Sequence, residues 1–136
     1  MSGNAKLVSG IILLTIPTIQ YGGYFLLTLL SGKTKLPLTD FQRSMFRAGH
    51  AHAGVLVILA IICQLLIDEA NAHALFEIFL RTGFPLAAIL VSAGFFASAS
   101  GRNVVKPNSF IIILFSGIIL LAAVLICLGI ALIKNR

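Results

Sequence analysis

The chain has 136 residues, of which 59% are hydrophobic and only 10% are charged. So few charged side chains cannot supply the polar surface of a soluble domain, and we expect one transmembrane domain over residues 1–136. The net charge of +6 would favour nucleic acid as a partner of a soluble protein. Here the basic residues lie beside apolar stretches, where lipid head groups and topology account for them, so we exclude nucleic-acid binding.

Four apolar stretches occupy most of the sequence: Leu7 to Leu30, Ala51 to Ile67, Thr82 to Ala99, and Phe110 to Ile133. A helix rises about 1.5 Å per residue, so these stretches match a hydrocarbon layer roughly 30 Å thick. With their polar flanks, we expect spans at about 7–30, 44–67, 75–99 and 110–133. The fold class is therefore an all-α, integral membrane four-helix bundle.

The first predicted span contains Pro17, which removes one backbone hydrogen bond from the helix. Gly22 and Gly23 follow in the second half of the span. Small residues in membrane helices usually mark close helix contacts, so this pair predicts a packing face.

The second helix is expected to begin near Asp40, well before its strongly apolar part. Thr39 and Gln42 have the spacing of a capping box, in which each side chain binds the other residue's backbone N–H. The first three turns of this helix are amphipathic, and the run FQRSMFRAGHAHAG occupies residues 41–54.

The third and fourth spans carry weaker signals. Asn71 is the expected N-cap of the third helix, Pro85 lies inside it, and Glu77 and Arg81 have the i, i+4 spacing of a helical ion pair. The third span is also rich in small residues that favour helix contacts. Pro107-Asn108-Ser109 precedes the fourth span, and the two cysteines, Cys63 and Cys127, are expected to be free rather than bridged.

The basic residues predict the orientation. The first and third connections carry Lys33, Lys35, Arg43, Arg47, Arg102 and Lys106, whereas the second connection opens with Asp68 and Glu69. Basic connections are usually cytoplasmic, which leaves both termini outside. We expect a multi-pass protein of a bacterial inner membrane.

The polar residues of the second helix fall on two faces, because successive residues are rotated by about 100°. Arg47 and His50 share one stripe, and His52 points to nearly the opposite side among apolar residues. The first stripe contains Arg43, Arg47, His50, Gly54, Ile61, Gln64 and Asp68, and the second contains His52, Val55, Leu59 and Cys63. We expect the first stripe to face a polar interior and His52 to lie at a contact between copies in a homo-oligomer.

Residues of the first span are expected at the same depth as these histidines. Gln20, Tyr21 and Tyr24 precede the cytoplasmic end of the first helix by a distance that matches Arg47, His50 and His52 on the second. Together they predict an inner-leaflet site for a small polar ligand, a metal ion or a proton. The alternative interpretation is that the tyrosines are membrane anchors and the arginines reach the head groups.

His50 and His52 are also the candidate metal ligands. Histidines two residues apart on a helix cannot easily chelate one ion together, and His73 is expected at the opposite membrane face. A transition metal or haem iron would therefore take one ligand from each of two copies. Histidines satisfied by hydrogen bonds are the simpler alternative.

Two resemblances add to this interpretation. The segment from Phe41 to Ala48, together with the length and the four spans, resembles the membrane-associated proteins in eicosanoid and glutathione metabolism, which are trimeric enzymes. Of the residues that hold glutathione in that family, only Arg47 carries over, because Ala51 and Gly54 stand where the family has asparagine and glutamate. The runs YGGYFLL, RAGHAHAGVLVIL and GFFASASG resemble an uncharacterised group of small bacterial membrane proteins with four spans.

Two classes of function follow. We favour a non-enzymatic module in which the polar site binds or passes a ligand or holds a partner subunit, because the sequence has no nucleophile motif and no pair of carboxylates inside a span. The alternative is a small membrane enzyme, either a glutathione-transferase-like trimer or a haem-dependent redox protein.

Overall fold

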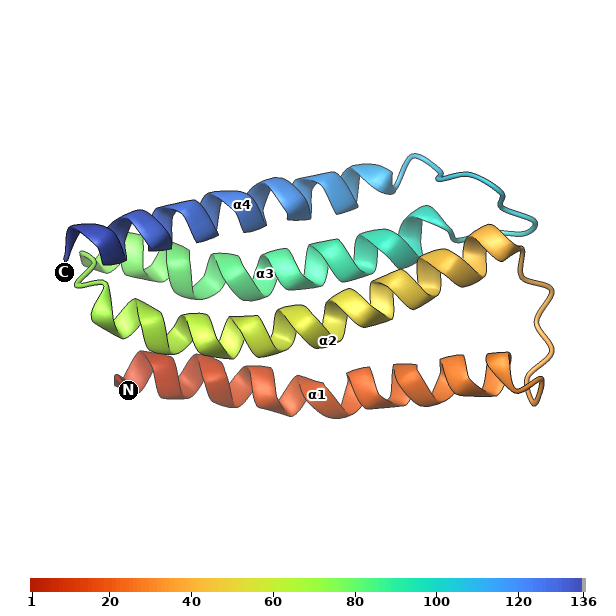
Figure 1. Cartoon of the computed structure of the whole chain (residues 1–136), viewed down its shortest axis with the longest axis horizontal. Helices are drawn as coiled ribbons and strands as arrows, with labels where there is room; N and C mark the ends of the chain where they lie inside the picture. The colour runs from red at the N-terminus through yellow and green to blue at the C-terminus, as the bar shows by residue number, and fades with distance from the viewer. Residues whose placement is uncertain (136) are drawn as a thin grey trace.

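The computed structural model describes residues 1–135 and consists of four long helices. Helix α1 spans Gly3–Leu30, α2 spans Asp40–Glu69, α3 spans Ala74–Ser98 and α4 spans Ile111–Lys134. Successive helices run in opposite directions, as Figure 1 shows. Each of the four is long and apolar enough to cross a membrane. The prediction of an all-α bundle with four candidate spans is confirmed.

The two ends of the bundle contain different segments of the chain. The N-terminus, the 70–73 connection and the end of α4 lie at one end, called the terminal end (Figure 1). The connections 31–39 and 99–110 lie at the other, called the loop end. The histidine-bearing part of α2 belongs to the half of the bundle nearer the loop end.

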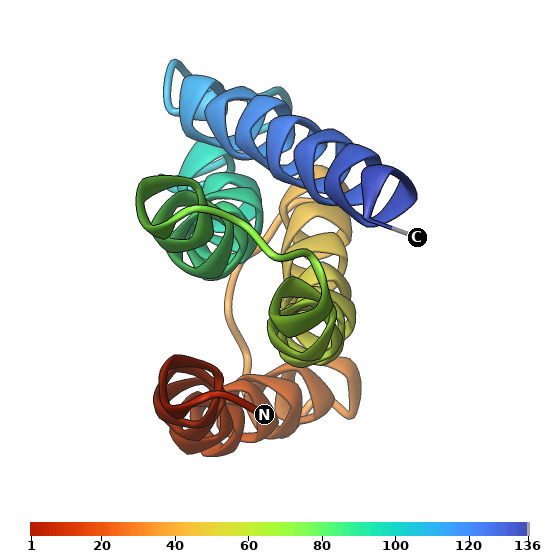
Figure 2. The same cartoon turned by 90° about the vertical axis from the view of Figure 1, so that its left-hand side faces the viewer.

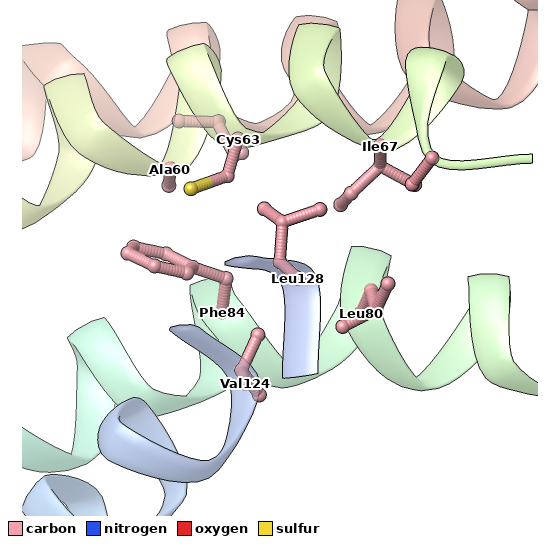
Figure 3. Packing of buried hydrophobic residues seen from close by; sticks show 9 residues of the cluster. Ala60, Cys63, Ile67, Leu80, Phe84, Val124 and Leu128 are labelled. Carbon is pink, nitrogen blue, oxygen red and sulfur yellow. The ribbon is translucent and has the colours of Figure 1, made fainter. Parts of the chain in front are cut away.

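The main hydrophobic core lies between α2, α3 and α4 (Figure 3). Phe84 and Leu80 of α3 are fully buried and meet side chains from both neighbouring helices. The labelled members of this cluster are Ala60, Cys63, Ile67, Leu80, Phe84, Val124 and Leu128. Helix α1 contributes Ile12 to the cluster and packs mainly along the outside of α2, as the end-on view in Figure 2 shows; near its start it also contacts α3. Most of α1 is therefore exposed on the bundle surface.

Helices α3 and α4 approach each other most closely at glycines. A Cβ atom at Gly94 would lie 2.4 Å from the backbone nitrogen of Leu114, and one at Gly117 would lie 2.6 Å from the backbone nitrogen of Val91. Any larger residue would push the two helices apart. Gly94 of the third span therefore serves the contact with α4, in agreement with the helix packing expected from the small residues.

The capping box predicted for α2 is confirmed. Thr39 Oγ1 accepts a hydrogen bond from the Gln42 backbone N–H at 3.2 Å, and Gln42 Oε1 accepts one from the Thr39 backbone N–H at 3.1 Å. The helix accordingly begins at Asp40.

The predicted N-cap of α3 is wrong. The helix begins at Ala74 with His73 in the N-cap position, where the histidine side chain makes no capping hydrogen bond. Asn71 instead has a φ of 45°, a left-handed conformation that asparagine tolerates better than most residues. Asn71 therefore turns the chain between α2 and α3 rather than capping a helix.

The connection before α4 is closed by Asn108. Its Oδ1 accepts a hydrogen bond from the Phe110 backbone N–H at 2.9 Å, and its side-chain amide donates to the Ala97 carbonyl at 3.0 Å. The polar residues that precede the fourth span thus tie the start of α4 to the end of α3.

Candidate functional site

His50 lies in the contact between α2 and α1. A Cβ atom added at Gly23 would lie 3.0 Å from His50 Nε2, and one added at Gly22 would lie 3.6 Å from Nδ1. The imidazole therefore rests against the backbone of α1, most closely at Gly23, where an added Cβ would crowd it. The glycine pair predicted to pack against another helix accommodates a histidine.

The ring of His50 is half-buried. Within residues 1–135, no hydrogen bond engages either of its nitrogens. The adjacent surface of α1 offers none, because the backbone groups of a helix interior are already paired within the helix. His50 therefore retains its capacity to form hydrogen bonds with a water molecule or a polar ligand.

His52 lies on the other flank of α2, beside α3. Its ring lies tilted against that of Phe95 with a centroid separation of 4.8 Å, and its Nδ1 lies 2.8 Å from the carbonyl oxygen of Ala48. A carbonyl oxygen only accepts hydrogen bonds, so Nδ1 must carry the proton. In the neutral ring this leaves the lone pair on Nε2, and the residue is exposed.

The two imidazoles do not form a joint site within one chain. They occupy opposite flanks of α2, one toward α1 and the other toward α3. Among residues 1–135, no group of three or more histidine, cysteine or acidic side chains is close enough to hold a metal ion. His73 lies at the terminal end, immediately before α3, and its ring is tilted against that of Phe76; this agrees with its expected separation from the other histidines.

The tyrosines do not join His50 in an inward-facing pocket. Tyr21 and Tyr24 are 72% and 61% exposed. Because they flank the glycines that face His50, each is rotated by well over 90° from that face. The predicted pocket of His50 with either tyrosine is therefore not formed within one chain, and Gln20 is exposed as well.

Both arginines at the start of α2 are exposed. Arg43 and Arg47 lie one helical turn apart and share the flank that follows His50 around the helix. Arg47 is thus a neighbour of His50 on the surface of α2, and His52 is not.

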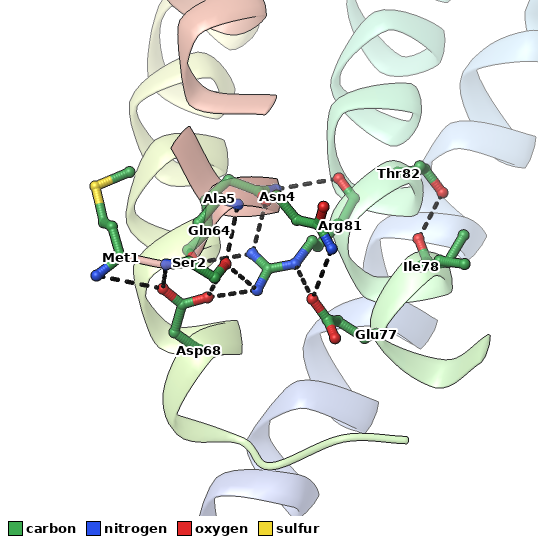
Figure 4. A network of polar contacts seen from close by, with 10 residues as sticks. All are labelled: Met1, Ser2, Asn4, Ala5, Gln64, Asp68, Glu77, Ile78, Arg81 and Thr82. Carbon is green, nitrogen blue, oxygen red and sulfur yellow. Dashed lines mark hydrogen bonds and ion pairs between the residues drawn. The ribbon is translucent and has the colours of Figure 1, made fainter. Parts of the chain in front are cut away.

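A second polar site, at the terminal end, joins three helices (Figure 4). Arg81 of α3 is only 4% exposed. Its Nε donates to Glu77 at 2.6 Å, and its Nη1 donates to the carbonyl and side-chain oxygens of Gln64 of α2, both at 3.2 Å. Its Nη2 pairs with Asp68 and donates to Ser2 Oγ, at the start of α1. The predicted Glu77–Arg81 pair is confirmed, but it is one part of a larger network.

This network is structural because it holds α1, α2 and α3 together; we call it the clamp. Asp68 accepts hydrogen bonds from both the backbone N–H and the hydroxyl of Ser2, at 2.6 and 2.7 Å. A cavity of about 380 Å³ lies beside the network, lined by Ser2, Asp68, Glu77 and Arg81 among others. All three nitrogens of the guanidinium already have protein partners, so no unpaired charge is directed into the cavity.

Sequence reasoning identified Gln64 and Asp68 on one stripe of α2 but missed their partner. The antiparallel pairing of α2 with α3 brings Gln64 level with Arg81. An arginine near a span boundary that falls level with a glutamine and an aspartate of the preceding helix was the available signal.

A third polar contact was also missed. Gln42 is buried, and its side-chain amide donates to the carbonyls of Ala99 and Gly101, each at 2.9 Å. It therefore joins the start of α2 to the end of α3 at the loop end. Cys63 and Cys127 are free, as expected.

Comparisons with protein-family models, with curated proteins and with solved structures found no match to this chain. The functional interpretation therefore depends on the four candidate membrane spans and on the polar residues described above.

Proposed function

We propose that the chain is a small membrane-embedded binding module that assembles as a homo-oligomer. It binds its ligand on the part of α2 that carries His50 and His52. The ligand is an electron-pair acceptor, either a transition metal ion or a haem iron, and His52 Nε2 is the donor atom. The observation that carries the proposal is the fixed tautomer and orientation of the exposed His52 ring.

Three features of His52 support this assignment. Its Nδ1–H is held by the Ala48 carbonyl, which fixes both the tautomer and the ring orientation, and its ring is steadied by Phe95. A hydrogen bond from one ring nitrogen to a backbone carbonyl is the usual support of a histidine that binds metal through the other. The lone pair of Nε2 on an exposed residue of a candidate span has no partner in lipid, where an unsatisfied polar atom is costly.

The oligomer follows from the number of ligands. One chain supplies a single suitably oriented imidazole on this flank, whereas haem iron or a metal ion takes further protein ligands. A second copy related by symmetry brings an equivalent His52. In such an assembly, Gln20, Tyr21 and Tyr24 on the exposed face of α1 are available to a neighbouring copy as polar contacts.

Passage of protons through a single chain is less well supported. His50 and Gln64 are fourteen positions apart on α2, about 21 Å along the helix. The residues of their stripe between them, Gly54 and Ile61, carry no polar side chain. The alternative of a glutathione-transferase-like enzyme is also weaker. Of the residues that hold glutathione in that family, this sequence retains only Arg47.

The orientation is part of the proposal. The loop end carries the basic connections, so we infer that it faces the cytoplasm of a bacterial inner membrane, with both termini outside. His50 and His52 then belong to the inner leaflet.

The test is the ligand content of the protein purified in mild detergent. We expect transition metal by elemental analysis or an intense Soret absorption band, and we expect His52→Leu to abolish the signal. His73→Leu is the matched control, because it removes an exposed imidazole at the terminal end. A wild-type protein reconstituted with metal ions or haemin that binds no more of either than His52→Leu would refute the proposal.

A further inference from the structure

Among residues 1–135, the cations of the loop end have no acidic partners. The exposed basic residues there are Lys33, Lys35, Arg43, Arg47, Arg102 and Lys106. The ion pairs formed among residues 1–135 all involve Asp68 or Glu77, at the terminal end. Asp40 is the carboxylate nearest to Arg43 in the sequence. Among residues 1–135, Asp40 and Arg43 form no ion pair with each other. The charge of the loop end therefore remains available to an external anion.

Two of these cations are placed differently from the others. Arg43 and Arg47 lie on a helix, on the same exposed flank and about 6 Å apart along the axis. The lysines and Arg102 belong to the connections. The Cα atoms of Arg43 and Arg47 are therefore held at a fixed spacing by α2, whereas the connection cations carry no such constraint from a helix.

The depth of these arginines follows from the helix pairing. Gln42 binds the carbonyls of Ala99 and Gly101, immediately after the end of α3, so Arg43 is level with the helix ends. Arg47 lies one turn deeper. A charged group at this depth reaches toward the head groups, because hydrocarbon cannot solvate it.

We propose that Arg43 and Arg47 form a binding site for the phosphate-bearing head group of an anionic phospholipid. Guanidinium groups donate paired N–H bonds that match phosphate oxygens, and two of them one turn apart can hold one phosphate from two sides. Ile58 lies eleven positions after Arg47, within about 20° of it around the axis, and is exposed. An acyl chain can therefore lie along the same flank beneath the head group, which favours a lipid over free phosphate.

This site is separate from the ligand proposed for His52, which lies on another flank of α2. Loss of one leaves the other intact. A failure of the lipid test therefore does not bear on the metal or haem test.

The experiment measures how phosphatidylglycerol stabilises the purified full-length protein against thermal unfolding in mild detergent, with phosphatidylcholine as the reference lipid. We expect Arg43→Gln combined with Arg47→Gln to weaken the apparent affinity for phosphatidylglycerol about 25-fold, from about fivefold for each guanidinium–phosphate hydrogen bond that is lost. Lys33→Gln with Lys35→Gln removes the same charge from the connection and should weaken it far less. Equal losses in the two double variants would overturn the site and indicate a diffuse charge effect.

One further double variant and one anion complete the test. Arg43→Lys with Arg47→Lys keeps the charge but removes the planar N–H fork, so we expect it to recover only part of the affinity. Full recovery would contradict phosphate recognition by guanidinium. If inorganic phosphate displaces phosphatidylglycerol at similar concentrations, the site binds a free anion and the lipid assignment is wrong.

Discussion

Substitution of Gly94 by alanine tests the close approach of α3 to α4. The added Cβ would lie 2.4 Å from the Leu114 nitrogen and 2.5 Å from its Cα. Ordinary contact requires separations above about 3.4 Å, so the helices must move apart by about 1 Å. Overpacking of this kind costs about 3 kcal/mol, and the better helix propensity of alanine returns about 1 kcal/mol. We expect a net loss of about 2 kcal/mol in the free energy of unfolding.

The control is Gly129→Ala in α4. A Cβ at Gly129 meets nothing within 4 Å, so the same chemical change there should be neutral or slightly stabilising. Both variants belong in a Cys127→Ser background, where the buried thiol of Cys63 reports opening of the core.

The assay is thiol labelling during titration with a denaturing detergent. Labelling of Cys63 should begin at a lower detergent fraction in Gly94→Ala than in Gly129→Ala. Coincident transitions would refute the helix contact, because the alanine methyl group would then have found room without separating α3 from α4.

The remaining predictions concern the two polar ends and the topology. Gly23→Ala places a methyl group 3.0 Å from His50 Nε2, whereas Gly22→Ala makes an ordinary 3.6 Å contact, so only the former should shift the His50 imidazole signals in NMR spectra. Identical spectra would contradict the contact. Arg81→Leu removes the centre of the terminal network and should cost about 3 kcal/mol of stability by the same thiol assay, since carboxylates lose their buried partner; an unchanged transition would contradict the clamp. Lys33→Cys should react with an impermeant thiol reagent only after cells are broken, and labelling of intact cells would invert the inferred orientation.

The helices were predictable because their signals are local. The apolar stretches predicted the four long helices, and the spacing of Thr39 and Gln42 predicted the start of α2. The Glu77–Arg81 pair was likewise evident, because i, i+4 neighbours meet in any regular helix.

Contacts between helices were harder to predict. The partnership of Arg81 with Gln64 and Ser2 depends on the register of three helices, which no single segment determines. The same limitation produced the error with Tyr21 and Tyr24: equal depth in the bundle was inferred correctly, but the side of α1 that meets α2 is chosen by the glycines between them. The depth of a residue in the bundle follows from helix rise alone. The direction in which its side chain points depends on how the helices pack.

The most direct test of the proposed function is native mass spectrometry of the protein released from detergent, since it reports copy number and bound ligand together. The proposal predicts an oligomer whose mass exceeds a multiple of the chain mass by that of a metal ion or haem, and the excess should disappear in His52→Leu but persist in His73→Leu. A monomer that takes up neither metal ions nor haemin when they are supplied would contradict it.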